Sequence, residues 1–576
     1  GQTINNYGVS RNGKEDTHKG DIKGDYNLSA KDLVSVRWSF FRQDIYRDGI
    51  FEGVADGANN QGGQFNTNNS FGGTWTRTIT PAVVNNLRFG YNRTYAAFTN
   101  AGIDGPGATA FGFKNIPTEA VDKNNGGLPL ISVTNYNQLG TRNFRPQFQA
   151  PELFQFLDSV SWVRGVHSVR AGFETRQKNN LFQDLARTVP AYTFGGRFTG
   201  EAAGDLLTGY LQQFDANTQT NVEQLQKAYA GYVQDDWKVR RNLTFNLGLR
   251  YEYTTPYYAK APNRNINFDP KTGKLVYPSD DTDYLVNADH SNIGPRIGAA
   301  WQILPNKLVM RGGYGLFFSG EDIFGSDVNL PLNPPQLIPV TLQQVGTGAP
   351  PFKLSDPVPS GLFNTVNSSI VSLRAREKDF HAARIQQFNV ALQYLLPGNS
   401  TFEVAYVGNR GNNLQFTYAL NQTPFGVDGS VPANRPYPQW SQITMGATRS
   451  KSWYDSLQLK FEKQMGHGLY TLASYTFANA YDLAGAYDAG TQPQYLDDLS
   501  TERGRQSQTP IHRFTWTNVW SLPIGKGHTF GNNWNRVTDA VFGGWQLSHI
   551  VSVRTGLPIN VTLAQTGVDP ATGRSY

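Results

Sequence analysis

The side chains that most often carry chemistry are scattered along this chain. Its eight histidines are far apart and none pairs with another at metal-ligand spacing: His18, His167, His290, His381, His467, His512, His528 and His549. The chain has no cysteine, which removes thiolate chemistry, disulfides and zinc–cysteine sites. Walker, Gly-x-Ser-x-Gly and His-Glu-x-x-His motifs are also missing. We therefore predict no catalytic residue, no cofactor and no metal site, in a protein that is not an enzyme.

Two groups of carboxylates lie in loop-like segments, three in each: Asp280, Asp281 and Asp283, and Asp497, Asp498 and Glu502. Carboxylates grouped on a loop can bind Ca²⁺. Neither group has the spaced ligands and the glycine of a calcium loop. We predict solvated loop residues, with cation or lipopolysaccharide bridging as the alternative.

Four basic residues occupy the polar side of segments in which polar and apolar residues alternate: Arg37, Arg88, Arg250 and Lys460. Since alternate side chains share one face of a strand, these four should face an interior. We expect them to pair with carboxylates there. Contact with an anionic substrate is the alternative.

Residues 231–253 show the alternation most clearly. They form two strand-like runs around a polar turn at 240–242. In the second run one face is apolar with aromatic residues at its end, and it consists of Leu243, Phe245, Leu247, Leu249, Tyr251 and Tyr253. In water this face must meet a second layer, whereas in a membrane it meets lipid and the polar face lines an interior.

The same alternation recurs near 34–40, 86–92, 457–462, 514–522 and 545–553. These segments run for about 9–12 residues, the length that a tilted strand needs to cross a bilayer. Aromatic residues placed at strand ends are interpreted as an interfacial girdle, and sugar stacking is the alternative; the examples are Trp38, Tyr251, Tyr253, Trp520 and Trp545.

Composition agrees with β structure in a cell envelope. The 576 residues include 59 Gly, 35 Phe, 28 Tyr and 11 Trp but only 3 Met, and aromatic residues favour strands. The net charge of +6 is spread along the chain, which gives no indication of a nucleic-acid partner. No apolar stretch reaches the ~18 residues of a membrane helix. The opening residues, GQTINNYGVS, do not resemble a signal peptide, so we expect a chain that is mature or trimmed at its start.

Strand order predicts an antiparallel barrel of about sixteen strands in hairpin pairs. The pairs are 18–28 with 33–44, 68–79 with 84–97, 153–162 with 168–178, 227–238 with 243–254, 295–303 with 308–318, 383–395 with 400–409, 453–463 with 469–479, and 511–522 with 544–556. Turns within pairs are short, and connections between pairs are long. We expect the short turns, such as 240–242 and 397–399, to be periplasmic and the long loops, such as 319–382 and 410–452, to be extracellular.

Two connections differ from the rest. Segment 523–543 is long where a short turn is expected, and we interpret it as an extended periplasmic turn. Segment 201–214, EAAGDLLTGYLQQF, predicts a brief helix within a loop, whose apolar residues serve local packing.

Six segments in this order resemble the barrel of TonB-dependent outer-membrane transporters, in particular the Oar-like group abundant in acidobacteria. They are SVSWVRGVHSVRAGFETR (159–176), YVQDDWKVRRNLTFNLGLRYE (232–252), GPRIGAAWQILPNKLVMRGGYGLFF (294–318), QQFNVALQYLLPGNSTFEVAYVGNRGNNL (386–414), WYDSLQLKFEKQMGHGLYTLASYTFANAYD (453–482) and GGWQLSHIVSVRTGLPINVT (543–562). The resemblance implies an energised transporter of the bacterial outer membrane. Its implied partners are membrane lipid, lipopolysaccharide, the TonB system and a plug domain, whose carboxylates could also pair with the four basic residues.

The family pattern is only partly present. Relatives have 22 strands, a plug, a TonB box and, in this group, an N-terminal sandwich domain, none of which we find. We therefore expect residues 1–576 to be one transmembrane barrel domain that is truncated at both ends and cannot close by itself. Two other hypotheses stay open: a surface-structural or adhesive barrel without uptake, and a soluble all-β carbohydrate-binding protein or enzyme. A siderophore, a vitamin, an oligosaccharide and a peptide are all open as the ligand.

Overall fold

The computed structural model describes most of the chain. The described residues are 7–51, 55, 62–100, 108–114, 128–142, 145–183, 189–218, 221–280, 283–320, 329–343, 353–356, 371–424, 427, 431–466, 468–483, 493 and 498–559. Parts of the predicted loop 319–382 (residues 321–328, 344–352 and 357–370) and the segment 560–576 therefore lie outside them.

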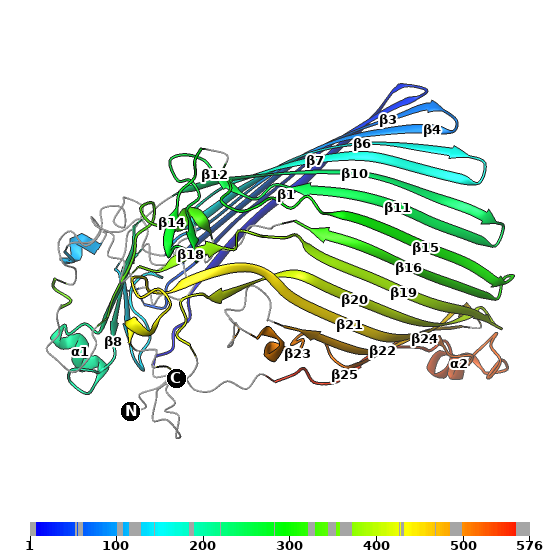
Figure 1. Ribbon diagram of the computed structural model, residues 1–576. Coiled ribbons are helices and arrows are strands. Elements are labelled where there is room, and N and C mark those ends of the chain that lie inside the picture. Colours follow the sequence, from blue (N-terminus) through cyan, green and yellow to red (C-terminus); the bar gives the residue numbers. More distant parts are fainter. Residues whose placement is uncertain are drawn as a thin grey trace.

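Long antiparallel strands form one curved sheet, in which each strand pairs with the next along the chain (Figure 1). The described residues contain sixteen such strands: β1 (Gly13–Ser29), β2 (Asp32–Arg47), β3 (Gly62–Thr80), β4 (Val83–Phe98), β6 (Gln147–Arg164), β7 (His167–Gln183), β10 (Val222–Arg240), β11 (Leu243–Thr254), β15 (Ile293–Leu304), β16 (Leu308–Ser319), β19 (Ala383–Leu396), β20 (Ser400–Ala419), β21 (Ile443–Gly466), β22 (Leu469–Asp482), β24 (His512–Ser521) and β25 (Gln546–Arg554). All eight predicted hairpin pairs are confirmed, and most strands extend further toward the long loops than predicted.

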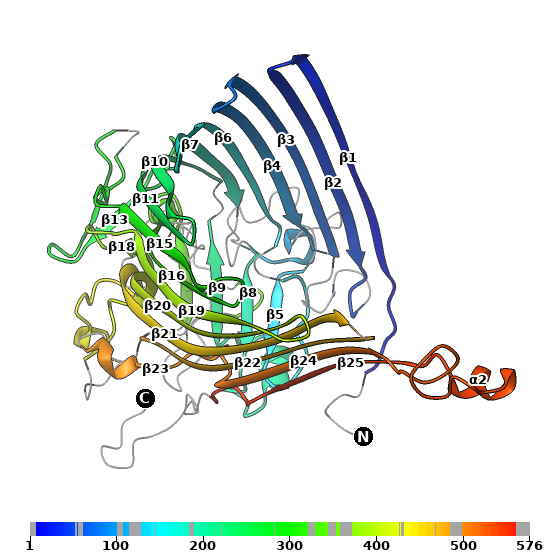
Figure 2. The same cartoon turned by 90° about the vertical axis from the view of Figure 1, so that its right-hand side faces the viewer.

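The sheet curves around a central space, as Figure 2 shows. Its outer face carries apolar side chains that no other layer of the described residues covers; Leu247 and Leu249 are 41% and 50% exposed. On the inner face the Arg250 side chain is only 17% exposed. The soluble-protein hypothesis required these apolar faces to be buried against protein, and it is wrong. An exposed apolar belt of this kind is stable where lipid covers it.

Short turns and long loops lie at opposite ends of the strands (Figure 1). The exception 523–543 sits at the short-turn end and contains α2 (Arg536–Phe542). The Asn535 side chain caps this helix by accepting hydrogen bonds from the backbone N–H groups of Val537 and Thr538, which occupies N–H groups that have no intrahelical partner. None of the helices in the described part of the chain is long and apolar enough to span a membrane.

The hydrophobic core lies in the loops rather than in the wall. Three loops contribute strands to a four-stranded sheet, β5 (Leu130–Val133), β8 (Ala191–Phe194), β9 (Gln213–Asn217) and β17 (Pro339–Gln343). The predicted helix is present but short, α1 (Ala202–Thr208), and ends at Gly209, which has a positive φ of 73°. Tyr192, Phe194, Phe214 and Leu211 are fully buried in this cluster.

Other residues of the loops form a second core. It joins the hairpin of β13 (Asn267–Asp269) and β14 (Lys274–Val276) to β18 (Leu373–Arg376) and to the far ends of β20 and β21. Phe268, Leu373 and Phe416 are buried there. The two views together place β5, β8 and β9 beyond the long-loop end of the wall and within the outline of the ring. The loops therefore build a folded cover across this mouth.

The two outermost strands have one partner each. Within the described residues β1 pairs only with β2, and β25 pairs only with β24. Both therefore present an edge whose backbone N–H and C=O groups have no strand partner there.

The sidedness can be tested because the chain has no cysteine of its own. We expect Lys271→Cys, in the exposed β13–β14 turn, to react with a membrane-impermeant maleimide on intact cells. Lys307→Cys, in the short β15–β16 turn, should react only after the outer membrane is permeabilised. Labelling of Lys307→Cys but not Lys271→Cys on intact cells would reverse the assignment.

Candidate functional site

The four basic residues predicted to face the interior do so, and three of them pair with carboxylates. An Arg37 Nη lies 2.7 Å from Asp21, and Lys460 Nζ lies 2.9 Å from Glu462. Arg250 contacts two carboxylates, described below. Arg88 differs, because its Nε donates to the Asn86 side-chain oxygen at 2.6 Å.

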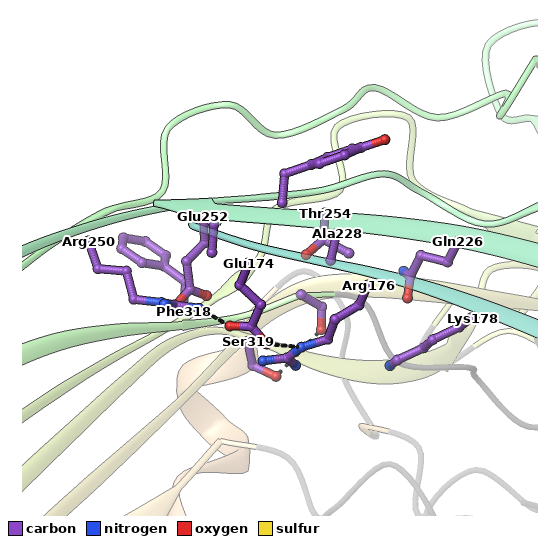
Figure 3. A pocket seen from close by; sticks show the side chains of 13 residues that line it. Glu174, Arg176, Lys178, Gln226, Ala228, Arg250, Glu252, Thr254, Phe318 and Ser319 are labelled. Carbon is purple, nitrogen blue, oxygen red and sulfur yellow. Dashed lines mark hydrogen bonds and ion pairs between the residues drawn. The ribbon is translucent and has the colours of Figure 1, made fainter. Parts of the chain in front are cut away.

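A network of interior contacts is centred on Glu174 of β7, whose side chain is 7% exposed. Figure 3 shows Glu174 between two arginines. Arg176 Nε donates to one carboxylate oxygen at 2.5 Å, and Arg250 donates to the other at 3.1 Å. Gln155 donates to the first oxygen at 2.7 Å, and Arg250 also contacts Glu252. We call these five residues the Glu174 network.

The Glu174 network borders a cavity of about 270 Å³. Lys178, Gln226, Thr254 and Ser319 add further polar groups to its lining. From the sequence we predicted an interior position for Arg250 but named neither Glu174 nor Arg176. Both lie on the polar face of β7, so the alternation that identified Arg250 would also have identified them.

A larger groove of about 830 Å³ lies on the interior wall. Part of its floor is backbone, because three glycines from three adjacent strands face inward: Gly248, Gly298 and Gly313. The Phe317 ring covers a fourth, Gly315. Arg296 and Phe317 stand at its side, with the guanidinium carbon 4.6 Å from the ring centre. A floor without side chains admits a flat group or an extended peptide close to the wall.

The outer loops enclose a third cavity, of about 950 Å³, between the β13–β14 hairpin and the ends of β18, β20 and β21. Its lining is mixed: Tyr277 offers an exposed aromatic ring, whereas Lys271, Asp269 and Arg449 offer charges of both signs. Arg449 is paired with Glu377. These features suit capture of a ligand that has apolar and polar parts.

Asp205 fixes the loop that carries α1. Its side chain is fully buried. One carboxylate oxygen accepts hydrogen bonds from the Thr199 backbone N–H and hydroxyl, both at 2.8 Å, and the Phe198 N–H donates at 3.3 Å. Burial raises the pKa of Asp205, but these donors stabilise the charged form more, so the net pKa is below its usual value. Burial of Tyr192 in the adjacent core raises the pKa of its phenol.

These contacts predict that the stability of the loop carrying α1 depends on pH. Because the folded pKa of Asp205 is below the unfolded value of about 3.9, its contribution is complete above that value and is lost as pH falls through the folded pKa. At pH 7, Asp205→Asn should cost the α1 loop about 2 kcal/mol. Faster hydrogen exchange at the Phe198 and Thr199 amides would report this cost, and the difference from wild type should shrink in acid.

Glu201→Gln is the matched control, since Glu201 precedes α1 but its side chain makes no capping bond. It should exchange like wild type at both pH values. Equal effects of the two substitutions would show that net charge, and not the Asp205 contacts, controls this loop.

The candidate acidic groups serve local structure where they are described. Asp283 accepts from the backbone N–H groups of Ser279 and Leu285, and Asp498 accepts from that of Ser500. Asp281, Asp497 and His467 lie outside the described residues. No group of three His, Asp or Glu side chains suited to a metal occurs among the residues that are described.

The strand-end aromatics divide into two sets. Tyr251, Trp520 and Trp545 are exposed, as expected for an interfacial girdle. Tyr253 is covered by stacking on His290, with ring centres 4.5 Å apart. Trp38 is not a strand-end residue, because β2 begins at Asp32 and Trp38 packs within it against Phe40.

Comparison with known proteins agrees with this architecture. Residues 1–575 match the family model described as outer membrane beta barrel domain, and the chain belongs to this family. It is a protein of the bacterial outer membrane. No curated protein matches the chain.

Among solved structures, the outer membrane transporter YddB from Escherichia coli has 11% identity and a TM-score of 0.51, over 94% of this chain and 62% of that one. The ferric yersiniabactin uptake receptor FyuA from Yersinia pestis has 8% identity and a TM-score of 0.46, over 93% and 62% of the two chains. The present chain thus spans about three fifths of the length of either. The YddB match shows a fold like that of TonB-dependent receptors.

Proposed function

We propose that this chain is the barrel of an Oar-like TonB-dependent transporter, which captures a ligand at its outer loops and takes it up with energy delivered by TonB. The observation that carries the proposal is the folded cover over the mouth. A passive pore needs an open mouth, whereas a gated transporter needs loops that hold a ligand and then move. The loop cavity of about 950 Å³ is large enough for initial capture of a small molecule.

The proposal assigns partners to two other surfaces. A plug domain of the same protein fits the polar interior, where the glycine-floored groove admits its backbone and the Glu174 network offers charged contacts. Further strands of the same protein complete the edges at β1 and β25. In hydrocarbon each unpaired backbone group costs several kcal/mol, so such edges must be paired.

Locking the cover tests the proposal. Asp215 on β9 faces Thr341 on β17, and the Thr341 hydroxyl donates to the Asp215 carboxylate at 2.6 Å. We expect Asp215→Cys with Thr341→Cys to form a disulfide when oxidised and to stop uptake, with recovery after reduction. Uptake is measured as depletion of solutes from the medium, in cells with and without TonB. The single variant Thr341→Cys is the control.

The two loop cores also support a second candidate, a surface-structural or adhesive barrel without uptake. Folded loops of this extent can present a stable surface to neighbouring cells. If cells expressing the protein aggregate, and neither TonB nor the disulfide changes solute depletion, the adhesive function replaces transport.

A further inference from the structure

A single row across four strands carries arginines and aromatic rings. Arg410 on β20 pairs with Trp453 on β21, Trp453 with Tyr481 on β22, and Tyr481 with Arg505 on β23 (Gly504–Arg505). Residues directly opposite one another in neighbouring strands share a face of the sheet. We call these four residues the arginine–aromatic row.

The row faces away from the interior. A parallel row in the same register lies four positions along each strand toward the short-turn end. It consists of Tyr406, Leu457 and Phe477. Their exposures of 40%, 42% and 43% place them on the uncovered outer face. Because alternate residues share a face, the arginine–aromatic row lies on that face too, beyond the apolar belt and toward the long loops. This is the level at which barrel aromatics meet lipid headgroups.

The arginines differ in how they are engaged. Arg410 donates to both oxygens of Asp455, at 2.8 and 3.0 Å, and to the Tyr454 carbonyl at 2.8 Å, so it holds the wall together. Arg503, which follows the 3-10 helix Leu499–Glu502 in a long loop, lies 5.1 Å from the ring centres of both Trp453 and Tyr481. Arg505 lies 5.4 Å from that of Tyr481.

Arg503 and Arg505 are exposed, and no carboxylate of the described residues forms an ion pair with either. Stacking on a ring orients a guanidinium while leaving its N–H donors available. Lys451 is also exposed and, two residues beyond Trp453, falls on the same face by alternation. Three cationic side chains thus lie at the border of the lipid-facing surface that is nearer the long loops.

We propose that Arg503, Arg505 and Lys451 bind the phosphate groups of a phosphorylated glycolipid of the lipid A type, in the outer leaflet. Guanidinium groups bind phosphate oxygens in pairs of hydrogen bonds, and the acyl chains would descend over Tyr406, Leu457 and Phe477. The inference needs the barrel to lie in the outer membrane with its long loops outside. It does not depend on whether the protein transports a ligand.

The test uses the protein in phosphatidylcholine nanodiscs that contain a small fraction of bisphosphorylated lipid A, with the lipid that stays bound measured by native mass spectrometry. We expect the double variant Arg503→Gln, Arg505→Gln to bind lipid A at least tenfold more weakly than wild type. The control Arg240→Gln, Arg241→Gln removes the same charge at the short-turn end and should bind like wild type. A heat-modifiable shift on gel electrophoresis verifies that each variant is folded.

Two further measurements distinguish binding of lipid A phosphate from binding of free phosphate. Wild-type protein should bind dephosphorylated lipid A as weakly as the Arg503, Arg505 variant binds the phosphorylated form. Inorganic phosphate should not displace lipid A at equal concentration. The proposal is overturned if both double variants bind alike, if dephosphorylated lipid A binds equally well, or if inorganic phosphate competes on equal terms.

Discussion

Replacement of Leu247 by arginine is expected to destabilise the folded barrel by about 2–4 kcal/mol. Leu247 is exposed on the outer face of β11, midway between Leu243 and Tyr251 on the same apolar row. A guanidinium placed there must lie in hydrocarbon or distort the bilayer to reach water. Urea titration of the protein folded in phospholipid vesicles, followed by tryptophan fluorescence, measures the change.

Asn246→Arg is the matched control, since it puts the same side chain one residue away on the opposite face. Asn246 borders the interior groove and donates to Asp236 at 2.5 Å. An arginine there can pair with Asp236 in an aqueous interior, so the cost should stay below about 1 kcal/mol. Equal losses at the two positions would contradict the assignment of lipid-facing and interior faces.

The strands were predictable because one rule governs each of them. A wall with lipid outside and water inside requires alternation, so Leu247 and Arg250 reveal their faces without any knowledge of the fold. Pair boundaries were set by polar turns such as 240–242, which the structure confirms between β10 and β11. What alternation could not give was strand length, because strands such as β21 continue beyond the membrane into the loop core.

The loop sheet could not be predicted for a different reason. β9 pairs with β17 across more than a hundred residues of chain, and each strand is too short to show a periodic pattern. Such long-range pairing depends on shape and packing, as with Phe214 and Tyr192, whose ring centres lie 5.3 Å apart. Local sequence rules carry no information about contacts of this separation.

The candidate site was predictable only in part. The inward direction of Arg250 followed from alternation, and a carboxylate partner was expected. That the partner is Glu174 could not be derived, because the two residues are 76 positions apart and their contact depends on the β7–β10–β11 register.

The Glu174 network provides the second large expected effect. Glu174→Ala should destabilise the folded protein by about 3 kcal/mol, because it leaves Arg176 and Arg250 without the carboxylate that both contact in a partly buried site. Arg250 retains Glu252, which places the estimate at the lower end of the range for a broken buried pair. The same vesicle-based urea titration gives the value.

A double-mutant cycle separates this charge network from simple packing. Because Arg250 contacts Glu174 directly, Glu174→Ala combined with Arg250→Ala should cost less than the sum of the single losses, by about 1–3 kcal/mol. The matched cycle pairs Glu174→Ala with Lys460→Ala, whose side chain contacts Glu462 instead, and its losses should add. If both cycles were additive, Glu174 would act as an isolated buried side chain, and the network would not be an energetic unit of the interior wall.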